Sequence, residues 1–180
     1  MTTTDSAMLG ASKHERRPND LYNTPEWCVE RMMENVILPR RIWEPACGEG
    51  NIVSALRKND KVVIHTDIDR GIDFLEKASM PPDTDCIVTN PPYTLAVEFI
   101  KQSLDLTHLC GGTVVMLLRN EYDCAKKRRH LFSHPFSKKI ILTKRPRWIE
   151  NTTGSPRHNY SWYVWSWQNG ITQPPTISYA

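Results

Sequence analysis

Hydrophobic residues along this chain form short runs that are separated by polar segments rich in glycine and proline. We predict six strands from the runs rich in β-branched and aromatic residues, at 41–44, 61–66, 84–89, 113–118, 139–143 and 161–167. We predict helices between them, at 24–36, 51–59, 95–108 and 122–132. Apolar strands that alternate with helices indicate an α/β fold, with a mostly parallel sheet, helices on both faces and an antiparallel C-terminal strand.

The length of 180 residues favours a single domain, which we place at 21–180. Residues 1–20 are polar and without periodicity, so we expect a mobile N-terminal arm. Thr24 followed by Pro25 predicts the capped start of the first helix. The segment 144–160 combines basic residues with Asn, Thr, Ser, Gly and Pro, and we expect it to be a loop that faces the substrate.

The chain shows no secretory signal, and no apolar run reaches the roughly 18 residues that cross a bilayer. Its five cysteines are widely spaced and include no C-x-x-C pair. We therefore expect free thiols and a cytoplasmic protein.

Charge is divided unevenly along the sequence. Residues 1–118 contain 12 Lys and Arg against 17 Asp and Glu, whereas residues 119–158 contain 11 against 3. This division suggests a cationic small ligand for the first part and a polyanion for the second. A merely solvated basic surface is the alternative.

Two features after the first two strands point to a cofactor that carries a nucleoside. The loop from Glu44 to Gly50 contains Gly48 and Gly50, which allow a tight turn and a close approach to a ligand. The loop lacks the third glycine of a dinucleotide site and the Gly-Lys-Ser/Thr of a P-loop. Asp67 ends the second strand, where a carboxylate can accept hydrogen bonds from ribose hydroxyls.

The most informative segment is Asn90-Pro91-Pro92-Tyr93, at the end of the third strand. The prolines remove two backbone donors, Asn90 adds an amide oxygen, and Tyr93 adds an aromatic face. Two acceptors beside a stacking surface suit a planar group with an exocyclic NH₂. An ordinary strand-to-turn segment is the structural alternative.

Together these motifs resemble the S-adenosylmethionine-dependent DNA amino-methyltransferases of the adenine type, in particular small phage-type members. The resemblance covers about 21–168 and implies a Rossmann-like methyltransferase fold with S-adenosylmethionine as the cofactor. It assigns cofactor contacts to Tyr22, Thr24, Pro25, Glu44, Pro45, Gly48, Gly50, Asp67, Ile68, Asp73, Phe74 and Asn90. It assigns catalysis to Asn90, Pro91, Pro92 and Tyr93.

The implied reaction methylates the exocyclic amine of a flipped-out adenine in DNA. Tyr93 would stack on the base, while the Asn90 side-chain oxygen and the Pro91 carbonyl accept from its amine. No metal is expected, because the pair His130 and His134 lacks the context of a zinc site.

Basic and aromatic residues of the second part are the predicted DNA contacts. They are Lys126, Lys127, Arg128, Arg129, Lys144, Arg145, Arg147, Trp148 and Arg157. Only about 40 residues separate the cofactor loop from the catalytic segment, which leaves no room there for a large recognition domain. We expect relaxed or short sequence specificity, or recognition shared across a homodimer. Methylation of RNA adenine, methylation of a protein glutamine amide, and an inactive nucleic-acid-binding module are the alternatives.

Overall fold

The computed structural model describes residues 22–148, 156–168 and 173–180. The predicted arm at 1–20 and part of the predicted loop at 144–160 lie outside these residues. The strands are β1 Arg41–Glu44, β2 Val62–His65, β3 Cys86–Thr89, β4 Thr113–Arg119, β5 Phe136–Ile141, β6 Tyr160–Ser166 and β7 Thr176–Tyr179. The α-helices are α1 Glu26–Met33, α2 Asn51–Lys58 and α3 Ala96–His108. The 3₁₀ helices are η2 Ile68–Arg70, η3 Phe74–Glu76, η4 Tyr93–Leu95, η5 Tyr122–Cys124 and η6 Lys126–Phe132.

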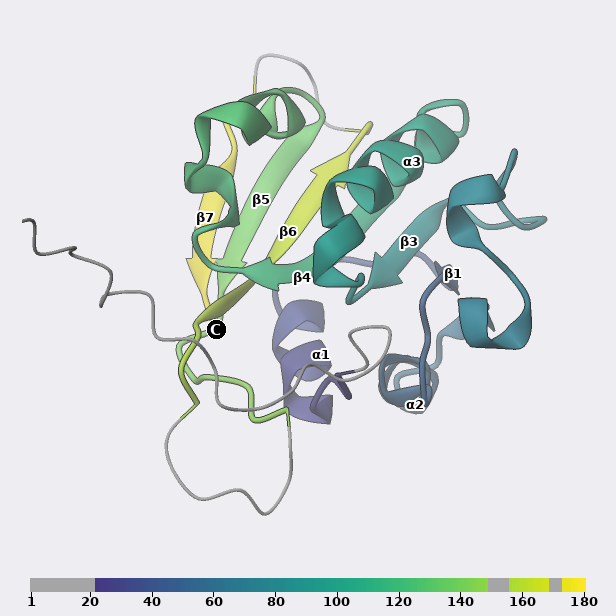
Figure 1. The fold of residues 1–180 in the computed structure, drawn as a ribbon, viewed down its shortest axis with the longest axis horizontal. Coiled ribbons are helices and arrows are strands. Elements are labelled where there is room, and N and C mark those ends of the chain that lie inside the picture. Colours follow the sequence, from purple (N-terminus) through teal and green to yellow (C-terminus); the bar gives the residue numbers. More distant parts are fainter. Residues whose placement is uncertain (1–21, 149–155, 169–172) are drawn as a thin grey trace, which may run out of the picture.

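The strands form one sheet in the order β2-β1-β3-β4-β6-β5-β7 (Figure 1). The four strands from β2 to β4 in this order pair in parallel, and β6 is antiparallel to both β4 and β5. The predicted α/β class, with its mostly parallel sheet and antiparallel strand near the C-terminus, is confirmed. Because β1, β2 and β3 are parallel, the segments that follow them all begin at one edge of the sheet.

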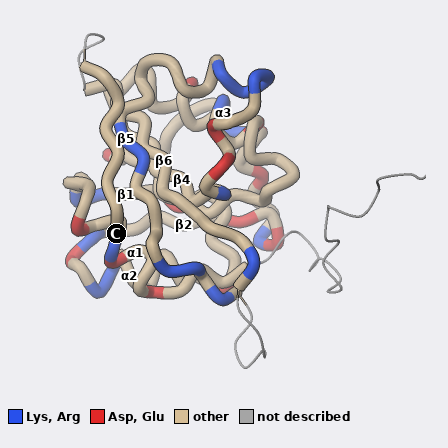
Figure 2. The backbone as a smooth tube through the Cα atoms, turned by 90° about the vertical axis from the view of Figure 1, so that its left-hand side faces the viewer, with Lys and Arg blue, Asp and Glu red and all other residues tan. Residues whose placement is uncertain are grey.

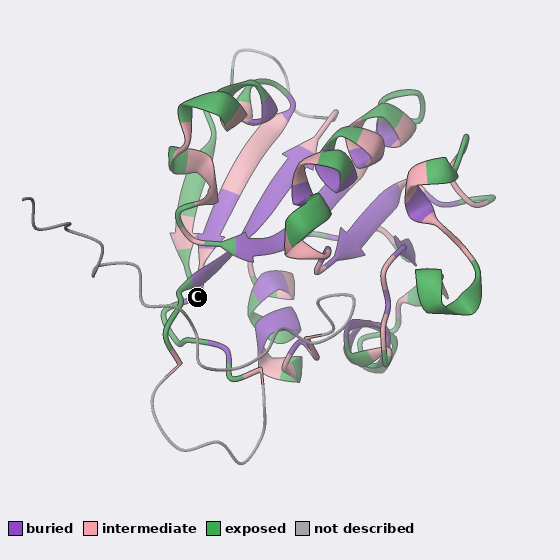
Figure 3. Ribbon diagram, viewed as in Figure 1, coloured by how far each residue is buried: buried purple, intermediate pink, exposed green. Residues whose placement is uncertain are grey.

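Apolar side chains alternate between the two faces of the sheet, and each face carries its own core. One core joins α1 and α2 to strand residues such as Ile42, Val115 and Trp162. The other joins α3 and η6 to residues such as Met116 and Trp165. The central strands are therefore buried on both sides (Figure 3), as a sheet covered by helices on both faces requires.

The structure departs from the sequence prediction at the C-terminal edge strand, at 122–132 and at the first helix. The sequence interpretation ended the sheet at 161–167, but β7 adds an edge strand parallel to β5. Its side chains are largely exposed (Ile177 61%, Tyr179 72%), so no buried hydrophobic pattern reveals it. The predicted helix 122–132 consists of η5 and η6, which are separated by the extended backbone of Ala125.

The first helix is also shorter than predicted. Pro25 is its N-cap and no side chain caps it. Thr24 is buried, and its hydroxyl instead accepts a hydrogen bond from the side chain of Asn90. Tertiary contact thus replaces the predicted local role of Thr24.

All five cysteines are free: Cys28, Cys47 and Cys86 are buried, whereas Cys110 and Cys124 are exposed. The longest helix in the described part of the chain has 13 residues, and none there has the length and apolarity needed to cross a bilayer.

Candidate active site

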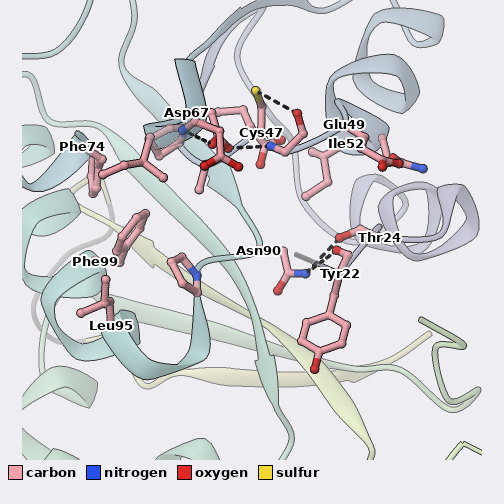
Figure 4. A pocket seen from close by; sticks show the side chains of 18 of the residues that line it. Tyr22, Thr24, Cys47, Glu49, Ile52, Asp67, Phe74, Asn90, Leu95 and Phe99 are labelled. Atoms are coloured by element: carbon pink, nitrogen blue, oxygen red, sulfur yellow. Dashed lines mark hydrogen bonds between the residues drawn. The ribbon is translucent and has the colours of Figure 1, made fainter. Parts of the chain in front are cut away.

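A pocket lies where β1, β2 and β3 end (Figure 4). It encloses about 860 Å³ of empty space, counting its open mouth. Its walls come from four segments that the sequence places far apart: 22–24, 44–52, 67–75 and 90–99. Three of these segments follow directly on parallel strands, which explains why they meet.

The loop between β1 and α2 forms one wall of the pocket. The Cys47 amide donates to the Thr66 carbonyl at 3.0 Å, which ties the loop to the end of β2. Gly48 and Gly50 have φ of 48° and 86°. Both values lie in the left-handed region, where a side chain is strained, as expected for glycines at a tight turn. Gly48 lines the pocket, whereas Gly50 lies behind it as the N-cap of α2.

Asp67 is held rigidly at the end of β2. Its two carboxylate oxygens accept from the Gly48 amide at 2.7 Å and from the Asp69 amide at 2.9 Å. Asp67 therefore caps η2 and orders the glycine loop, while its carboxylate still lines the pocket. A carboxylate oxygen can accept more than one hydrogen bond, so a ligand hydroxyl can be bound as well. Ile68 lies beside it and is 55% exposed.

Phe74 forms an apolar wall of the pocket, across from the loop between β1 and α2 (Figure 4). Its ring centroid lies 5.2 Å from that of Trp43 and 4.8 Å from that of Phe99. Asp73 precedes it and accepts from the Leu75 amide at 2.8 Å, which starts η3. The predicted Asp-Phe pair therefore lies in the pocket, with Asp73 at its surface and Phe74 anchored in the core.

The pocket is acidic. Its lining carboxylates are Glu44, Glu49, Asp67, Asp69 and Asp73, and the described lining residues include no Lys or Arg. Clustered carboxylates in a partly enclosed cavity create a negative potential that attracts a cation.

Glu44 is the most deeply buried of these acids, with 1% of its surface exposed. Burial raises the pKa of its carboxyl well above the usual value, and the nearby charge of Asp67 raises it further. Its Oε2 atom is buried and has no hydrogen-bond partner among the described residues. Glu44 thus offers an unused acceptor to a donor in the pocket.

Asn90 lies in the middle of the pocket, and its amide has a defined orientation. Nδ2 donates to the hydroxyl of Thr24 at 3.2 Å and to the backbone carbonyl of Tyr22 at 3.4 Å. Its Oδ1 points away from Thr24 (Figure 4) and is buried without a partner among the described residues. An unpaired buried acceptor costs about 1–3 kcal/mol, which a ligand N–H would relieve.

Of the three residues that follow Asn90 in the Asn-Pro-Pro-Tyr segment, only one lines the pocket. Pro92 lines it, whereas Pro91 is buried and Tyr93 does not line it. The Tyr93 ring instead packs among Tyr22, Tyr160 and, beyond these, Trp148. Its hydroxyl is buried, and burial raises its pKa well above the usual value, with the neighbouring Tyr160 raising it further.

The structure divides the predicted DNA-binding residues into two separate groups. Lys126, Lys127, Arg128 and Arg129 belong to η6, which crosses the face of the sheet that α3 covers, and Arg128 lies over the Tyr122 ring at 4.1 Å. The segment 144–148 follows β5 at the pocket end of the sheet. Figure 2 shows Lys and Arg in blue at the top and at the bottom of the molecule, in agreement with this separation.

Only the second group lies near the Asn-Pro-Pro-Tyr segment. Trp148 packs against Tyr22 and Tyr160, and Lys144 lies over the Trp27 ring at 5.0 Å. Arg145 donates to the side chain of Asn159 at 2.7 Å, while Arg147 and Arg157 are exposed.

The sequence analysis missed Arg119, at the end of β4. It pairs across the sheet with Tyr160. Burial lowers the pKa of His158, and the charges of Arg119, Arg157 and Arg145 lower it further. We call Arg119, Arg145 and Arg157 the arginine cluster. Arg119 is the last residue of β4, the strand that follows α3. Because the carboxyl ends of parallel strands share one edge of the sheet, this position could have identified Arg119 from the sequence.

Other pocket residues were also missed: Asn23, Ala46, Cys47, Glu49, Asn51, Ile52, Asp69, Leu75, Leu95 and Phe99. The side chain of Asn23 donates to that of Glu49, which joins the N-terminal segment to the glycine loop. Pro25, which was predicted to touch the cofactor, is not among the lining residues, whereas Pro45 is.

No family model and no curated protein sequence matches the chain. Among solved structures, it is similar to a protein from Listeria monocytogenes assigned as a class I S-adenosylmethionine-dependent methyltransferase, with 13% identity and a TM-score of 0.55, over 86% of this chain and 62% of that one. It is similar to a modification subunit assigned to a type I restriction enzyme of Vibrio vulnificus, with 14% identity and a TM-score of 0.53, over 88% of this chain and 46% of that one. It is also similar to an assigned O-methyltransferase of Agrobacterium tumefaciens, with 11% identity and a TM-score of 0.52, over 86% and 84% of the two chains.

This likeness shows that the fold is the Rossmann-like fold of S-adenosylmethionine-dependent methyltransferases. The chain spans less than two thirds of the length of the Listeria and Vibrio proteins.

Proposed function

We propose that this protein transfers a methyl group from S-adenosylmethionine to the exocyclic amine of adenine in DNA. The observation that carries the proposal is the Asn90 side chain. Its amide nitrogen is engaged by Thr24 and Tyr22, so its buried Oδ1 is left to accept from an amine in the same pocket.

The pocket fits the proposed cofactor in charge and in its unused acceptors. S-adenosylmethionine supplies a methyl group on a positively charged sulfur, and its ammonium group adds a second cation. Five carboxylates and no basic side chain among the described lining residues suit such a ligand. Glu44 Oε2 can accept from the ammonium group, Asp67 from the ribose, and Phe74 with Ile68 can pack on the adenine ring.

The catalytic contribution of the chain would be alignment and the exclusion of water. A base turned out of its stack presents its amine to Asn90 Oδ1 and to the Pro91 carbonyl. Holding both N–H bonds directs the nitrogen lone pair out of the ring plane, toward the electrophile. Placing reacting groups in this way can supply several kcal/mol of the barrier.

DNA as the substrate is supported by the arginine cluster and by one structural neighbour. The cluster surrounds His158 at the pocket end of the sheet, and its member Arg119 pairs across the sheet with Tyr160, so it can contact the phosphates on either side of a flipped base. The Vibrio neighbour is a modification subunit of a restriction enzyme. We further propose short or relaxed sequence specificity, a single domain over 21–180, and DNA contact by residues 144–160.

The test uses the purified full chain with S-adenosylmethionine carrying a labelled methyl group. Double-stranded DNA, single-stranded DNA and RNA are offered separately, digested to nucleosides and examined by mass spectrometry. We expect N6-methyladenine from DNA. Label in RNA alone, or on a protein amide alone, would overturn the proposed substrate, and the absence of any transfer would overturn the activity.

The Asn90→Ala variant should lose at least 100-fold in kcat, because its amide is the group proposed to hold the amine. Its affinity for S-adenosylmethionine should change less than fivefold in calorimetry. Asn59→Ala is the matched control, since Asn59 is exposed at the other end of α2. Equal losses of turnover and cofactor affinity in Asn90→Ala would contradict the assigned role.

A further inference from the structure

Two tyrosines from distant parts of the chain face each other next to Asn90. The ring centroids of Tyr22 and Tyr93 lie 5.9 Å apart, with an interplanar angle of 25°. Tyr93 belongs to the Asn-Pro-Pro-Tyr segment, and Tyr22 precedes α1. Tyr160 and Trp148 close the sides, with ring centroids 5.9 Å from Tyr93 and from Tyr22, respectively.

The two rings form an offset-stacked pair in direct contact, because nearly parallel rings with centroids about 4.5–7 Å apart touch face to face. A base stacked on both sides needs about 3.5–4 Å to each ring, or about 7–8 Å between the walls. An outward movement of the Tyr22 ring by about one ring thickness, ~3.5 Å, would open a slot that admits a base. Tyr93 has much less freedom, because its hydroxyl is buried and its segment is continuous with the sheet and α3.

The Tyr22 backbone links this slot to the amine acceptor. Its carbonyl accepts from Asn90 Nδ2, and the neighbouring Thr24 hydroxyl accepts from the same nitrogen. The phenol ring of Tyr22 points away from Asp67 and Phe74 (Figure 4), which form the part of the pocket suited to the cofactor. The ring is therefore placed for a second ligand rather than for the cofactor.

We propose that Tyr22 is the second wall of the slot that holds the target base, with Tyr93 as the first. This inference rests on the proposed function and deepens it, because it moves the Tyr22 ring from cofactor contact to substrate contact. The base lies between the two rings, and its amine reaches Asn90 Oδ1. Thr24 and the Tyr22 carbonyl act as positioning groups, since they fix the orientation of the Asn90 amide.

The experiment compares Tyr22→Ala, Tyr22→Phe and the control Tyr179→Ala, which alters an exposed tyrosine of the edge strand β7. The substrate is a DNA duplex with one target adenine. Steady-state methylation gives KM and kcat, calorimetry gives the Kd for S-adenosylmethionine, and a duplex with 2-aminopurine at the target position reports unstacking by fluorescence.

We expect Tyr22→Ala to raise the KM for DNA about 10- to 100-fold, as the loss of one stacking ring implies. The Kd for the cofactor should stay within twofold, and Tyr22→Phe should restore KM to within about threefold of the wild type. In Tyr22→Ala the fluorescence of bound 2-aminopurine should rise, because one quenching ring is removed.

If the wild type is active and Tyr22→Ala leaves the KM for DNA unchanged or lowers it, this inference alone is overturned. Tyr22 would then either block access to Tyr93 or have no role in substrate binding. A cofactor Kd that rises with KM would return Tyr22 to the cofactor site. A wild type that transfers no methyl group to DNA would overturn the proposed function, and this inference with it.

Discussion

The buried carboxyl of Glu44 should make the free protein less stable than a neutral variant. The residue is 1% exposed, and its Oε2 has no partner among the described residues. A hydrogen bond with the Thr89 side chain offsets part of the rise in pKa that burial causes, whereas the charge of Asp67 adds to it. Glu44→Gln keeps the shape of the side chain and removes the charge. Relief of an unpaired buried charge of this kind amounts to about 1–2 kcal/mol, or roughly 3–6 °C in Tm for a chain of this length.

The pH dependence of this effect has a definite sign. The pKa of Glu44 is raised in the folded protein above its unfolded value, so the folded state binds more protons between the two values. The wild type therefore gains stability as the pH falls through this range. The advantage of Glu44→Gln should increase from pH 4 to pH 8 and should be small near pH 4, where the carboxyl is largely protonated in both states.

Thermal unfolding from pH 4 to pH 8, with and without S-adenosylmethionine, measures the stability difference between the two proteins and its dependence on pH. If Glu44 binds the ammonium group, Glu44→Gln should weaken cofactor affinity about 10- to 100-fold, and saturating ligand should reduce or reverse the order of the two Tm values. A Glu44→Gln variant that is less stable than the wild type at pH 7, or a difference independent of pH, would refute this account of the site.

The remaining predictions concern the fold, the thiols and the DNA surface. Gly112→Ala would bring a Cβ to 2.2 Å from the Asp85 carbonyl and should lower the unfolding free energy by about 2–3 kcal/mol; Gly111→Ala, with open space around it, should cost only about 1 kcal/mol in the same denaturant titration. A thiol reagent should modify the exposed Cys110 and Cys124 quickly in the native protein, and Cys28 and Cys86, which lie in the core, only on unfolding, as mass spectrometry can follow; rapid labelling of Cys28 and Cys86 would contradict the described packing. Replacing all three residues of the arginine cluster by alanine should reduce the slope of log K for DNA binding against log salt concentration by about 2–3. Replacing the basic residues of η6 by alanine should leave this slope nearly unchanged. The reverse result would show that DNA binds at η6 instead.

Local patterns determined the scaffold and the edge of the sheet at which the pocket lies. Buried strands such as β3 and β4 carry long apolar runs, and Gly50 precedes a helix at a turn that needs positive φ. Asp67 and Asn90 were found because each ends a parallel strand, and such ends meet whatever the rest of the chain does. A largely exposed edge strand such as β7 has no such pattern and was missed.

Tertiary structure alone decided how the side chains around Asn90 are arranged. Thr24 has the sequence signature of a helix cap, yet it lies 66 residues from the amide that its hydroxyl binds. Tyr22 faces Tyr93 across a similar separation, and the two basic segments, which are close in sequence, end up far apart. These contacts depend on how whole layers pack, and residue spacing along a chain carries information about neighbours within one helix or strand rather than between layers.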